Sequence, residues 1–549
     1  MTARATVRRL AAATLAVALA GAIVSGCSST ADDVDYAVGG VLDTYNTNTV
    51  DGAASAGPQA FARVLTGFSY HGPDGQVVAD HDFGTVSVAG RAPLVLDYQI
   101  SDNAVYSDGI PVTCDDMLLT WAAQSGRFPQ FGAASRAGYT DIAGLECQAG
   151  AKKARVTFIN DRNFVDHLQL FGATSMMPAH VLSDRLGYGV TEAIQAVDPV
   201  RIAEIAEAWN TTWALSPGVD TAGFPSSGPY RIDSVRDDGA VLLVANERWW
   251  GSKPITARVT VWPRSIEIQD RLDDRAVDIV DVPAGSSGTL SVPDDFDRVE
   301  KPSAGIQQLF FAPVGVASVI PARRAIALCT PREEIARNAG VPLSNARLNP
   351  AADDAFSPVE NVPESGGPFV NGDPAAARAS LGGKPLNVRI GYRAPNARLA
   401  AVVGAIARAC QPAGILVEDA AGPDVGPSSL QSGAIDVLVA GTGGASGSGS
   451  TGSSAMDAYQ FHSANGNNLP RYINPAVDGI VSALAVTTDP KEQTRLLRDG
   501  DVALWEDMPT LPLYRQQRLL LTSKKMHAVT TNVTKWGAGW NMDRWQRSK

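Results

Sequence analysis

The sequence predicts an α/β protein of two or three domains. After about residue 304, short apolar runs alternate with segments of helical periodicity, which is the pattern of a largely parallel sheet covered by helices. The chain of 549 residues is also longer than one hydrophobic core usually accommodates. No period of about 20 to 50 residues recurs, which argues against a repeat architecture.

Residues 1–26 have the organisation of a bacterial lipoprotein signal peptide. Arginines precede an apolar run over residues 10–24 that is too short for a stable membrane span. Val24-Ser25-Gly26 then leads directly into Cys27, the lipobox pattern in which the thiol receives a diacylglycerol before cleavage. We expect Cys27 to carry lipid, palmitate included, and residues 27–40 to form a tether to the extracytoplasmic side of the cell membrane. The alternative is ordinary signal-peptidase cleavage beside a chance cysteine.

Composition and charge argue against nucleic acid as a partner. The formal net charge is −11 with a pI near 5.1, and Lys and Arg are scattered along the chain. With 45% hydrophobic and 19% charged residues the chain is too apolar to be disordered. No second apolar stretch approaches the roughly 20 residues of a membrane span. The mature chain is therefore expected outside the membrane, as a monomer without a cofactor.

Four cysteines remain after the lipidated one, an even number in an oxidising compartment. The sequence allows three pairings. We favour Cys114 with Cys147 and Cys329 with Cys410, because each bond then closes a loop within one expected domain. A metal site is the competing interpretation, but neither a CxxC motif nor a nearby pair of histidines supports it.

The first half of the chain shows helix and strand patterns in turn. A helix is expected at Gln59–Leu65, and the alternation over Pro93–Ile100 indicates a half-buried strand. Thr113 or Asp115 can cap a helix whose apolar face includes Trp121. Further strands are expected at 154–159, 230–235, 240–245 and 258–262. In the second half, strands are expected at 306–311, 386–390 and 435–439, and helices at 322–337, 399–409 and 475–485.

A glycine- and serine-rich run, residues 441–454, follows the last of these strands. Its backbone N–H groups could hold an anion, but it contains neither a Walker lysine nor a GxGxxG motif. A flexible surface or hinge loop is the simpler interpretation.

The segment Tyr106–Trp121, YSDGIPVTCDDMLLTW, resembles the signature of the family 5 extracellular solute-binding proteins, the dipeptide- and oligopeptide-binding receptors of ABC importers. Further landmarks follow in the family's order and cover nearly the whole mature chain. They are Ser226–Arg231, Asn246–Gly251, Val277–Asp281, Arg323–Glu334, Tyr472–Asp478 and Asp507–Tyr514.

This resemblance implies a periplasmic-binding-protein-like fold, in which two α/β lobes close on a ligand and one carries an extra inserted domain. The first lobe would be discontinuous, over residues 41–62, 225–303 and 509–549. The inserted domain would cover 63–224 and the second lobe 304–508. The implied function is a lipid-anchored receptor that binds a peptide or peptide-like solute and delivers it to ABC permease subunits for import.

One departure from the family concerns the ligand. Peptide-binding members carry an acidic, tryptophan-containing stretch in which an aspartate pairs with the amino terminus of the peptide. Here residues 441–454 occupy that place, and the first acidic residue afterwards is Asp457. Peptide specificity is therefore open. The alternative function is a lipoprotein of the same fold that regulates cell-envelope assembly without transport.

Five residues are candidates for ligand contacts. Asp457 could pair with a cationic group, or cap a helix. Trp536 and Trp540 lie in an aromatic tail segment and could wall a ligand site, or anchor the C-terminus in the core. Tyr45 and Asn46 fall where the family's N-terminal segment lines the cleft.

No motif for catalysis or metal binding accompanies these candidates. The sequence contains no GxSxG elbow, and its six histidines show no HxH or HExxH spacing. The adjacent Asp115 and Asp116 need not act together, because neighbouring side chains on a helix diverge. The sequence therefore predicts a binding protein and not an enzyme.

Overall fold

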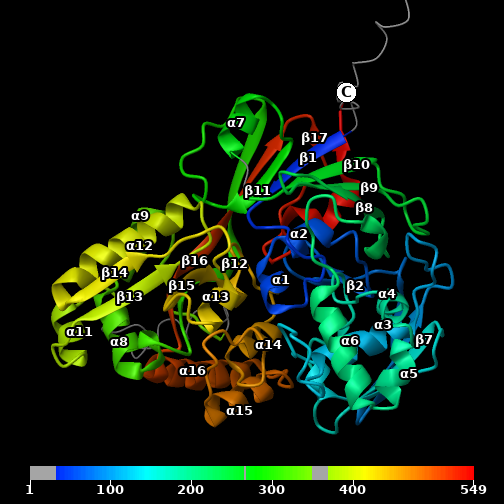
Figure 1. The fold of residues 1–549 in the computed structure, drawn as a ribbon, viewed down its shortest axis with the longest axis horizontal. Helices are drawn as coiled ribbons and strands as arrows, with labels where there is room; N and C mark the ends of the chain where they lie inside the picture. Colours follow the sequence, from blue (N-terminus) through cyan, green and yellow to red (C-terminus); the bar gives the residue numbers. More distant parts are fainter. Residues whose placement is uncertain (1–32, 265–266, 349–368, 549) are drawn as a thin grey trace, which may run out of the picture.

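The computed structural model describes residues 33–264, 267–348 and 369–548 (Figure 1). The signal peptide, Cys27 and the first part of the expected tether lie outside these ranges. A ten-stranded sheet runs through the molecule, and a four-stranded sheet with its helices packs beside one end of it. None of the described helices combines the length and the apolar character that crossing a membrane requires.

The ten-stranded sheet has the order β14-β13-β15-β12-β16-β11-β1-β10-β9-β8. In that order its strands are Ile415–Asp419, Leu386–Gly391, Val437–Gly441, Phe296–Phe311, Thr510–Ser523, Ile279–Pro283, Asp33–Val38, Arg258–Trp262, Val241–Ala245 and Tyr230–Val235. The strands that the sequence predicted in these regions are confirmed within a few residues, apart from β12, which begins ten residues earlier than expected.

The sheet is mixed, which corrects the expectation of a largely parallel one. β13 is parallel to β14 and β15, and β1 is parallel to β10 and β11. β12 and β16, however, are antiparallel to each other and to their outer neighbours. The α/β class is confirmed. At the centre of the sheet, however, lie two long antiparallel strands from distant parts of the sequence, and not parallel strands connected through helices.

β12 and β16 connect the two ends of the sheet. The first part of β12 pairs with the last part of β16, beside β11, and the second part of β12 pairs with the first part of β16, beside β15. The register between them shifts between Pro302 and Ile306. Below, the "β14 end" means the sheet from β14 to β15 and the "β8 end" the sheet from β11 to β8.

Strand β1 corrects the expected tether. Residues 33–38 lie between β10 and β11, and Val34, Tyr36 and Ala37 are completely buried. The apolar side chains of this short segment alternate with Asp33 and Asp35, which is the period of a strand. The tether can therefore extend only as far as residue 32.

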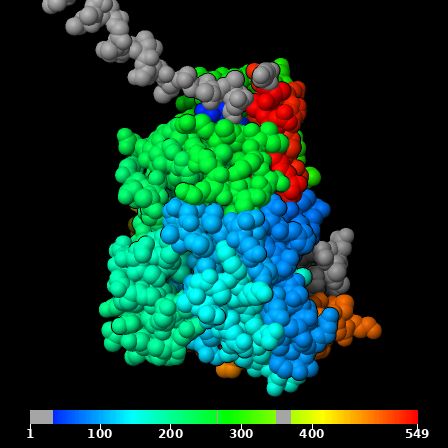
Figure 2. All heavy atoms as spheres, turned by 90° about the vertical axis from the view of Figure 1, so that its right-hand side faces the viewer, coloured from blue at the N-terminus to red at the C-terminus, as the bar shows by residue number. Residues whose placement is uncertain are grey.

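The four-stranded sheet has the order β4-β5-β7-β6 and is covered by four helices, which together we call the small-sheet region. In Figure 2 this region, blue to teal, lies directly below the green strands of the β8 end, with which it shares a hydrophobic core. The strands are Gly84–Arg91, Leu94–Ile100, Lys153–Phe158 and Ile142–Cys147, and the helices are α3 Cys114–Gln124, α4 Ala179–Leu186, α5 Val190–Gln195 and α6 Pro199–Thr211.

Helix α3 begins where the sequence indicated. Thr113 and Asp116 form a capping box, so Thr113 and not Asp115 is the cap. Asp115 instead accepts hydrogen bonds from the Thr113 and Thr191 hydroxyl groups. A disulfide bond between Cys114 and Cys147 ties the start of α3 to β6.

At the β14 end, the helix expected over 322–337 is two helices. α8 ends at Cys329 and α9 begins at Arg332, because Pro331 disfavours helical backbone at Thr330 and offers no N–H. Cys329 is bonded to Cys410 at the end of α12. The helices of this end are α8 Ile320–Cys329, α9 Arg332–Ala339, α11 Pro374–Ser380, α12 Ala397–Cys410, α13 Pro427–Gln431, α14 Ser454–Asp457, α15 Pro475–Leu484 and α16 Pro490–Asp507.

The remaining elements are short. The helix expected at Gln59–Leu65 is α2, Gly57–Phe61, which continues as a turn through hydrogen bonds from Val64 and Leu65 to the Phe61 carbonyl. The others are α1 Val50–Ala54, α7 Ile268–Asp273, β2 Ser69–His71, β3 Val77–Ala79, β17 Met526–His527 and β18 Gln546–Arg547. The division into two lobes and an inserted domain stays a prediction.

Candidate ligand-binding site

A partly enclosed cavity lies where six segments of the chain meet. Its volume is about 110 Å³, which is room for several water molecules or a small solute. None of its lining residues is exposed. Part of the wall follows β15 at the β14 end, and the rest comes from the β8 end and the small-sheet region. The six segments are residues 47–53, 69–71, 124–139, 169–175, 442–467 and 535–536.

The glycine- and serine-rich run forms part of this wall, so its interpretation as a flexible surface loop is wrong. Ser450 is completely buried, and Ala445 and Ser448 are nearly so. A Cβ atom on Gly449 would lie 1.9 Å from the Thr442 carbonyl oxygen, so the close approach of two parts of the run requires glycine there. Glycine in the run therefore allows its two parts to pack closely against each other.

Asp457 lines the cavity and also holds its wall. Its carboxylate accepts hydrogen bonds from Ser450 Oγ (2.5 Å), Thr451 N (2.9 Å) and Thr451 Oγ1 (2.8 Å). Burial raises the pKa of this carboxyl group, and the hydrogen bonds from Ser450 and Thr451 oppose that rise. Most of the acceptor capacity of Asp457 is thus used within the protein.

Trp536 also lines the cavity, as predicted for at least one of the two tryptophans. Its ring stacks on His71 at a centroid distance of 3.9 Å and an interplanar angle of 11°. Burial lowers the pKa of His71 to about 4, so this histidine is neutral at pH 7. The two rings form a flat, uncharged part of the wall.

Lys535 is a cavity residue that the sequence reasoning missed. It is half-buried, and its Nζ lies 4.8 Å from the centroid of the Trp536 ring. Burial lowers the pKa of Lys535, whereas the charge of Asp457 raises it. A lysine directly before the aromatic tail was visible in the sequence, but nothing in the local pattern distinguished it from a surface lysine.

Side-chain amides make up much of the remaining wall, and sequence reasoning missed these as well. Three polar atoms of wall residues have no hydrogen-bond partner among the described residues and almost no accessible surface of their own: Gln124 Nε2, Gln169 Oε1 and Trp536 Nε1. Such unpaired buried groups are uncommon in folded proteins. The amide-bearing residues of the wall are Asn48, Gln124, Gln169, Gln460 and Asn467.

The other three candidates lie outside the cavity. Tyr45 is completely buried among Phe61 and Phe224, and its hydroxyl donates to the Pro225 carbonyl (3.1 Å). Asn46 Nδ2 donates to the Trp209 carbonyl (3.0 Å).

Trp540 stacks on Tyr70 and lines a separate hollow. The N-terminal segment does reach the cavity, but through Thr47 and Asn48, the residues directly after the two candidates. The segment predicted from the sequence therefore reaches the cavity, whereas Tyr45 and Asn46 themselves do not line it.

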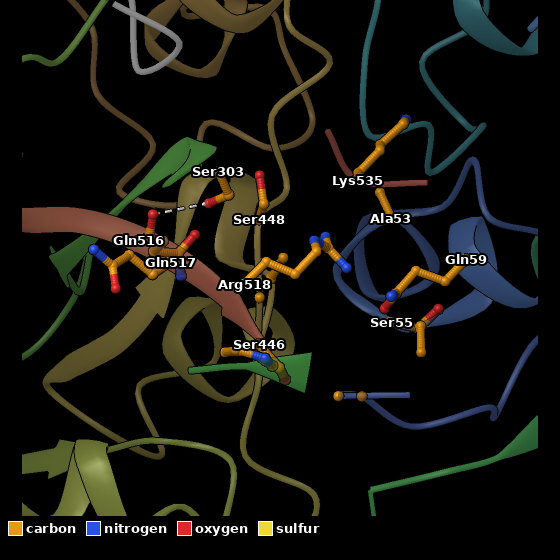
Figure 3. A pocket seen from close by; sticks show the side chains of 16 residues that line it. Ala53, Ser55, Gln59, Ser303, Ser446, Ser448, Gln516, Gln517, Arg518 and Lys535 are labelled. Atoms are coloured by element: carbon orange, nitrogen blue, oxygen red, sulfur yellow. Dashed lines mark hydrogen bonds between the residues drawn. The ribbon is translucent and has the colours of Figure 1, made fainter. Parts of the chain in front are cut away.

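A second, smaller pocket of about 20 Å³ adjoins the crossing strands (Figure 3). Ser303 Oγ donates to the Gln516 carbonyl across the register shift (3.2 Å). Arg518 extends from β16 and forms an ion pair with the buried Asp281 of β11 (2.8 Å). Lys535 lines this pocket as well as the larger cavity, which places the lysine between the two.

One group of side chains among the described residues has the proximity that a metal site needs: Cys114, Asp115 and Cys147. The two cysteines are joined in a disulfide bond and offer no thiolate. This group therefore does not compete with the cavity as a functional site.

Comparison with known proteins identifies the family of the chain. The profile described as bacterial extracellular solute-binding proteins, family 5, matches residues 92–461. A protein of Mycobacterium tuberculosis strain H37Rv, named an uncharacterized lipoprotein, is 62% identical over 535 residues, which is 96% of each chain.

Solved structures show the same fold at low sequence identity. A periplasmic EDTA-binding protein aligns with a TM-score of 0.73 and 19% identity, over 94% of this chain and 96% of the other. The oligopeptide-binding protein AppA of Bacillus subtilis, solved with a nonapeptide, aligns with a TM-score of 0.73 and 16% identity, over 94% and 99% of the chains. The expected fold is thereby confirmed, and the chain belongs to family 5 of the bacterial extracellular solute-binding proteins.

Proposed function

We propose that this chain is the lipid-anchored, extracytoplasmic solute-binding component of an ABC transporter, and that it binds a peptide or peptide-like solute for import. The observation that carries the proposal is the cavity, whose walls come from both ends of the large sheet. A solute bound there contacts both walls when they are together. Binding and closing are then coupled, as in a hinged trap.

The crossing strands are suited to be the hinge. β12 and β16 run from one end of the sheet to the other, and their register is interrupted between Pro302 and Ile306. The wall formed by residues 442–467 follows β15, whereas residues 47–53 follow β1. Bending at the interruption would therefore separate these two parts of the wall.

The comparisons leave a wide range of solutes open. Proteins of this fold include one named for EDTA and one solved with a nonapeptide, so the fold alone does not select the ligand. The amides of Asn48 and Asn467 support a solute with amide or carboxyl groups, because Asn48 Oδ1 and Asn467 Nδ2 form no hydrogen bond among the described residues. The small volume supports a short solute.

A thermal-shift screen of di- to pentapeptides, murein peptides and haem tests the proposal. At free ligand near 100 times Kd, binding adds about 2.7 kcal/mol to the free energy of unfolding. We expect a saturable rise in Tm with at least one class. Ala53→Trp, which places a large side chain in the cavity wall, should abolish this rise.

Ala149→Trp is the matched control, since Ala149 lies in an exposed turn. A rise that survives Ala53→Trp would place the binding site elsewhere. No rise with any ligand, combined with a scattering profile that no ligand changes, would refute the receptor function and favour the alternative role in envelope assembly.

Anchoring through Cys27 is part of the proposal and has its own test. Cys27→Ala should move the protein from the membrane fraction to the soluble fraction of a bacterial host, because the lipid attachment site is lost. Lys384→Gln, an exposed substitution, should stay in the membrane fraction. Retention of the Cys27→Ala protein at the membrane would contradict the lipobox interpretation.

A further inference from the structure

Gln124 and Trp536 flank the cavity and are only 6% and 7% exposed. Gln124 Nε2 and Trp536 Nε1 have no hydrogen-bond partner among the described residues, but these two atoms have almost no accessible surface, so they do not face the cavity. The solute class is therefore inferred from the charged groups of the wall.

The cavity also holds a cation whose nearest opposite charge is already engaged. Among the described residues, the Lys535 ammonium group forms neither an ion pair nor a hydrogen bond. Asp457 is the acidic residue of the wall, but Ser450 and Thr451 occupy its oxygens. His71 supplies no second cation, since it is neutral at pH 7. A partly desolvated ammonium in this position is suited to an anionic partner.

We propose that the solute is compact and carries a carboxylate or a comparable oxyanion, which Lys535 neutralises. The small volume of the cavity, about 110 Å³, favours a compact solute over a long, extended peptide. This inference rests on the proposed function and narrows its solute class.

The test compares acids with their amides on the full-length lipoprotein in detergent. A library of amino acids, dipeptides and dicarboxylic acids is measured by calorimetry, and each acid is paired with its primary amide. We expect at least one acid to bind at least ten-fold more tightly than its amide, because the amide keeps the shape and loses the charge.

Four proteins then show whether the charge of Lys535, and not a change in the fold, causes the preference for the acid. They are the wild type, Lys535→Gln, Lys535→Arg and Lys384→Gln. Lys535→Gln should remove the ten-fold preference for the acid. Lys535→Arg should retain most of it, and the exposed control Lys384→Gln should retain all of it. Unliganded melting curves show whether each variant is folded.

Each other outcome overturns the inference in a recognisable way. Equal binding of acids and amides, or a preference that survives Lys535→Gln, would refute the anionic solute and leave the receptor function standing. Binding of tetra- and pentapeptides alone would refute the compact solute and also leave the receptor function standing. No binding by any acid, amide or peptide would overturn both proposals.

Discussion

Asp457 is both a wall of the cavity and a support for it. The sequence suggested a carboxylate that pairs with a cationic group of the ligand, or one that caps a helix. The structure instead gives this carboxylate three donors from the glycine- and serine-rich run. Its role in the fold could not be predicted, because nothing in the sequence shows that the run turns back onto it.

Asp457→Ala should therefore destabilise the unliganded protein. The substitution leaves the Ser450 and Thr451 donors without their acceptor in a buried place, which costs about 2 to 4 kcal/mol in the free energy of unfolding. Asp457→Asn keeps one acceptor and should cost less. Urea unfolding measures both, with the exposed Asp74→Ala as the control. Unchanged stability of the alanine variant would show that the carboxylate does not hold the run.

His71 should make stability depend on pH. Burial lowers its folded-state pKa to about 4, whereas an unfolded histidine titrates near 6.5. The stability that the neutral ring contributes is fully present above pH 6.5 and is lost as pH falls from 6.5 toward 4. Between pH 7 and pH 5 the wild type should lose about 2 kcal/mol more than His71→Phe, which keeps the stacked ring and does not titrate. Urea unfolding of both proteins at the two pH values tests this, and equal losses would refute it.

At the scale of elements, the sequence correctly predicted the helices and strands whose own residues form a clear pattern. Thr113 and Asp116 form a capping box within four residues, and the alternation over Leu94–Ile100 recurs as buried and half-buried positions in β5. It failed at β1, where a six-residue strand follows directly on a polar segment. It also failed at Pro331, where two short helices in succession looked like one. Short elements carry too few residues to establish a period.

The disulfide between Cys329 and Cys410 fixes the end of α8 relative to the end of α12. It closes a loop over a sequence separation of 81 residues, which restricts the unfolded chain. Replacing both cysteines with serine should lower the free energy of unfolding by about 4.5 kcal/mol on the chain-entropy account. Peptide mapping without reduction should recover the Cys329–Cys410 and Cys114–Cys147 pairs from the wild type. Free thiols at these positions in the exported protein would contradict the pairing.

At the scale of the molecule, the family landmarks predicted the fold, but the cavity required the structure. Its wall combines residues as distant in sequence as Asn48, Gln124 and Lys535, none of which lies in a motif. Their proximity depends on β12 and β16 crossing the sheet, a pairing between segments about 210 residues apart that local periodicity cannot reveal.

A contact on the outer surface of the molecule bears on the proposed closing and lies apart from the cavity. Asp51 of α1 accepts a hydrogen bond from the Ser428 backbone N–H of α13 (3.2 Å) and contacts the Ser428 hydroxyl. α1 follows β1, whereas α13 precedes β15, so this contact joins opposite sides of the proposed hinge. It can exist only when the walls are together.

Asp51→Ala should therefore weaken ligand binding without altering the ligand's own contacts. An exposed polar contact contributes up to about 1 kcal/mol, so affinity should fall by about five-fold, through faster dissociation. Small-angle scattering of the unliganded variant should show a larger radius of gyration, while saturating ligand should restore the compact form. Asp74→Ala, an exposed substitution away from this contact, should change neither quantity. If Asp51→Ala left affinity and dimensions unchanged, the α1–α13 contact would not contribute to closing, and the hinge at Pro302–Ile306 would need support from another contact.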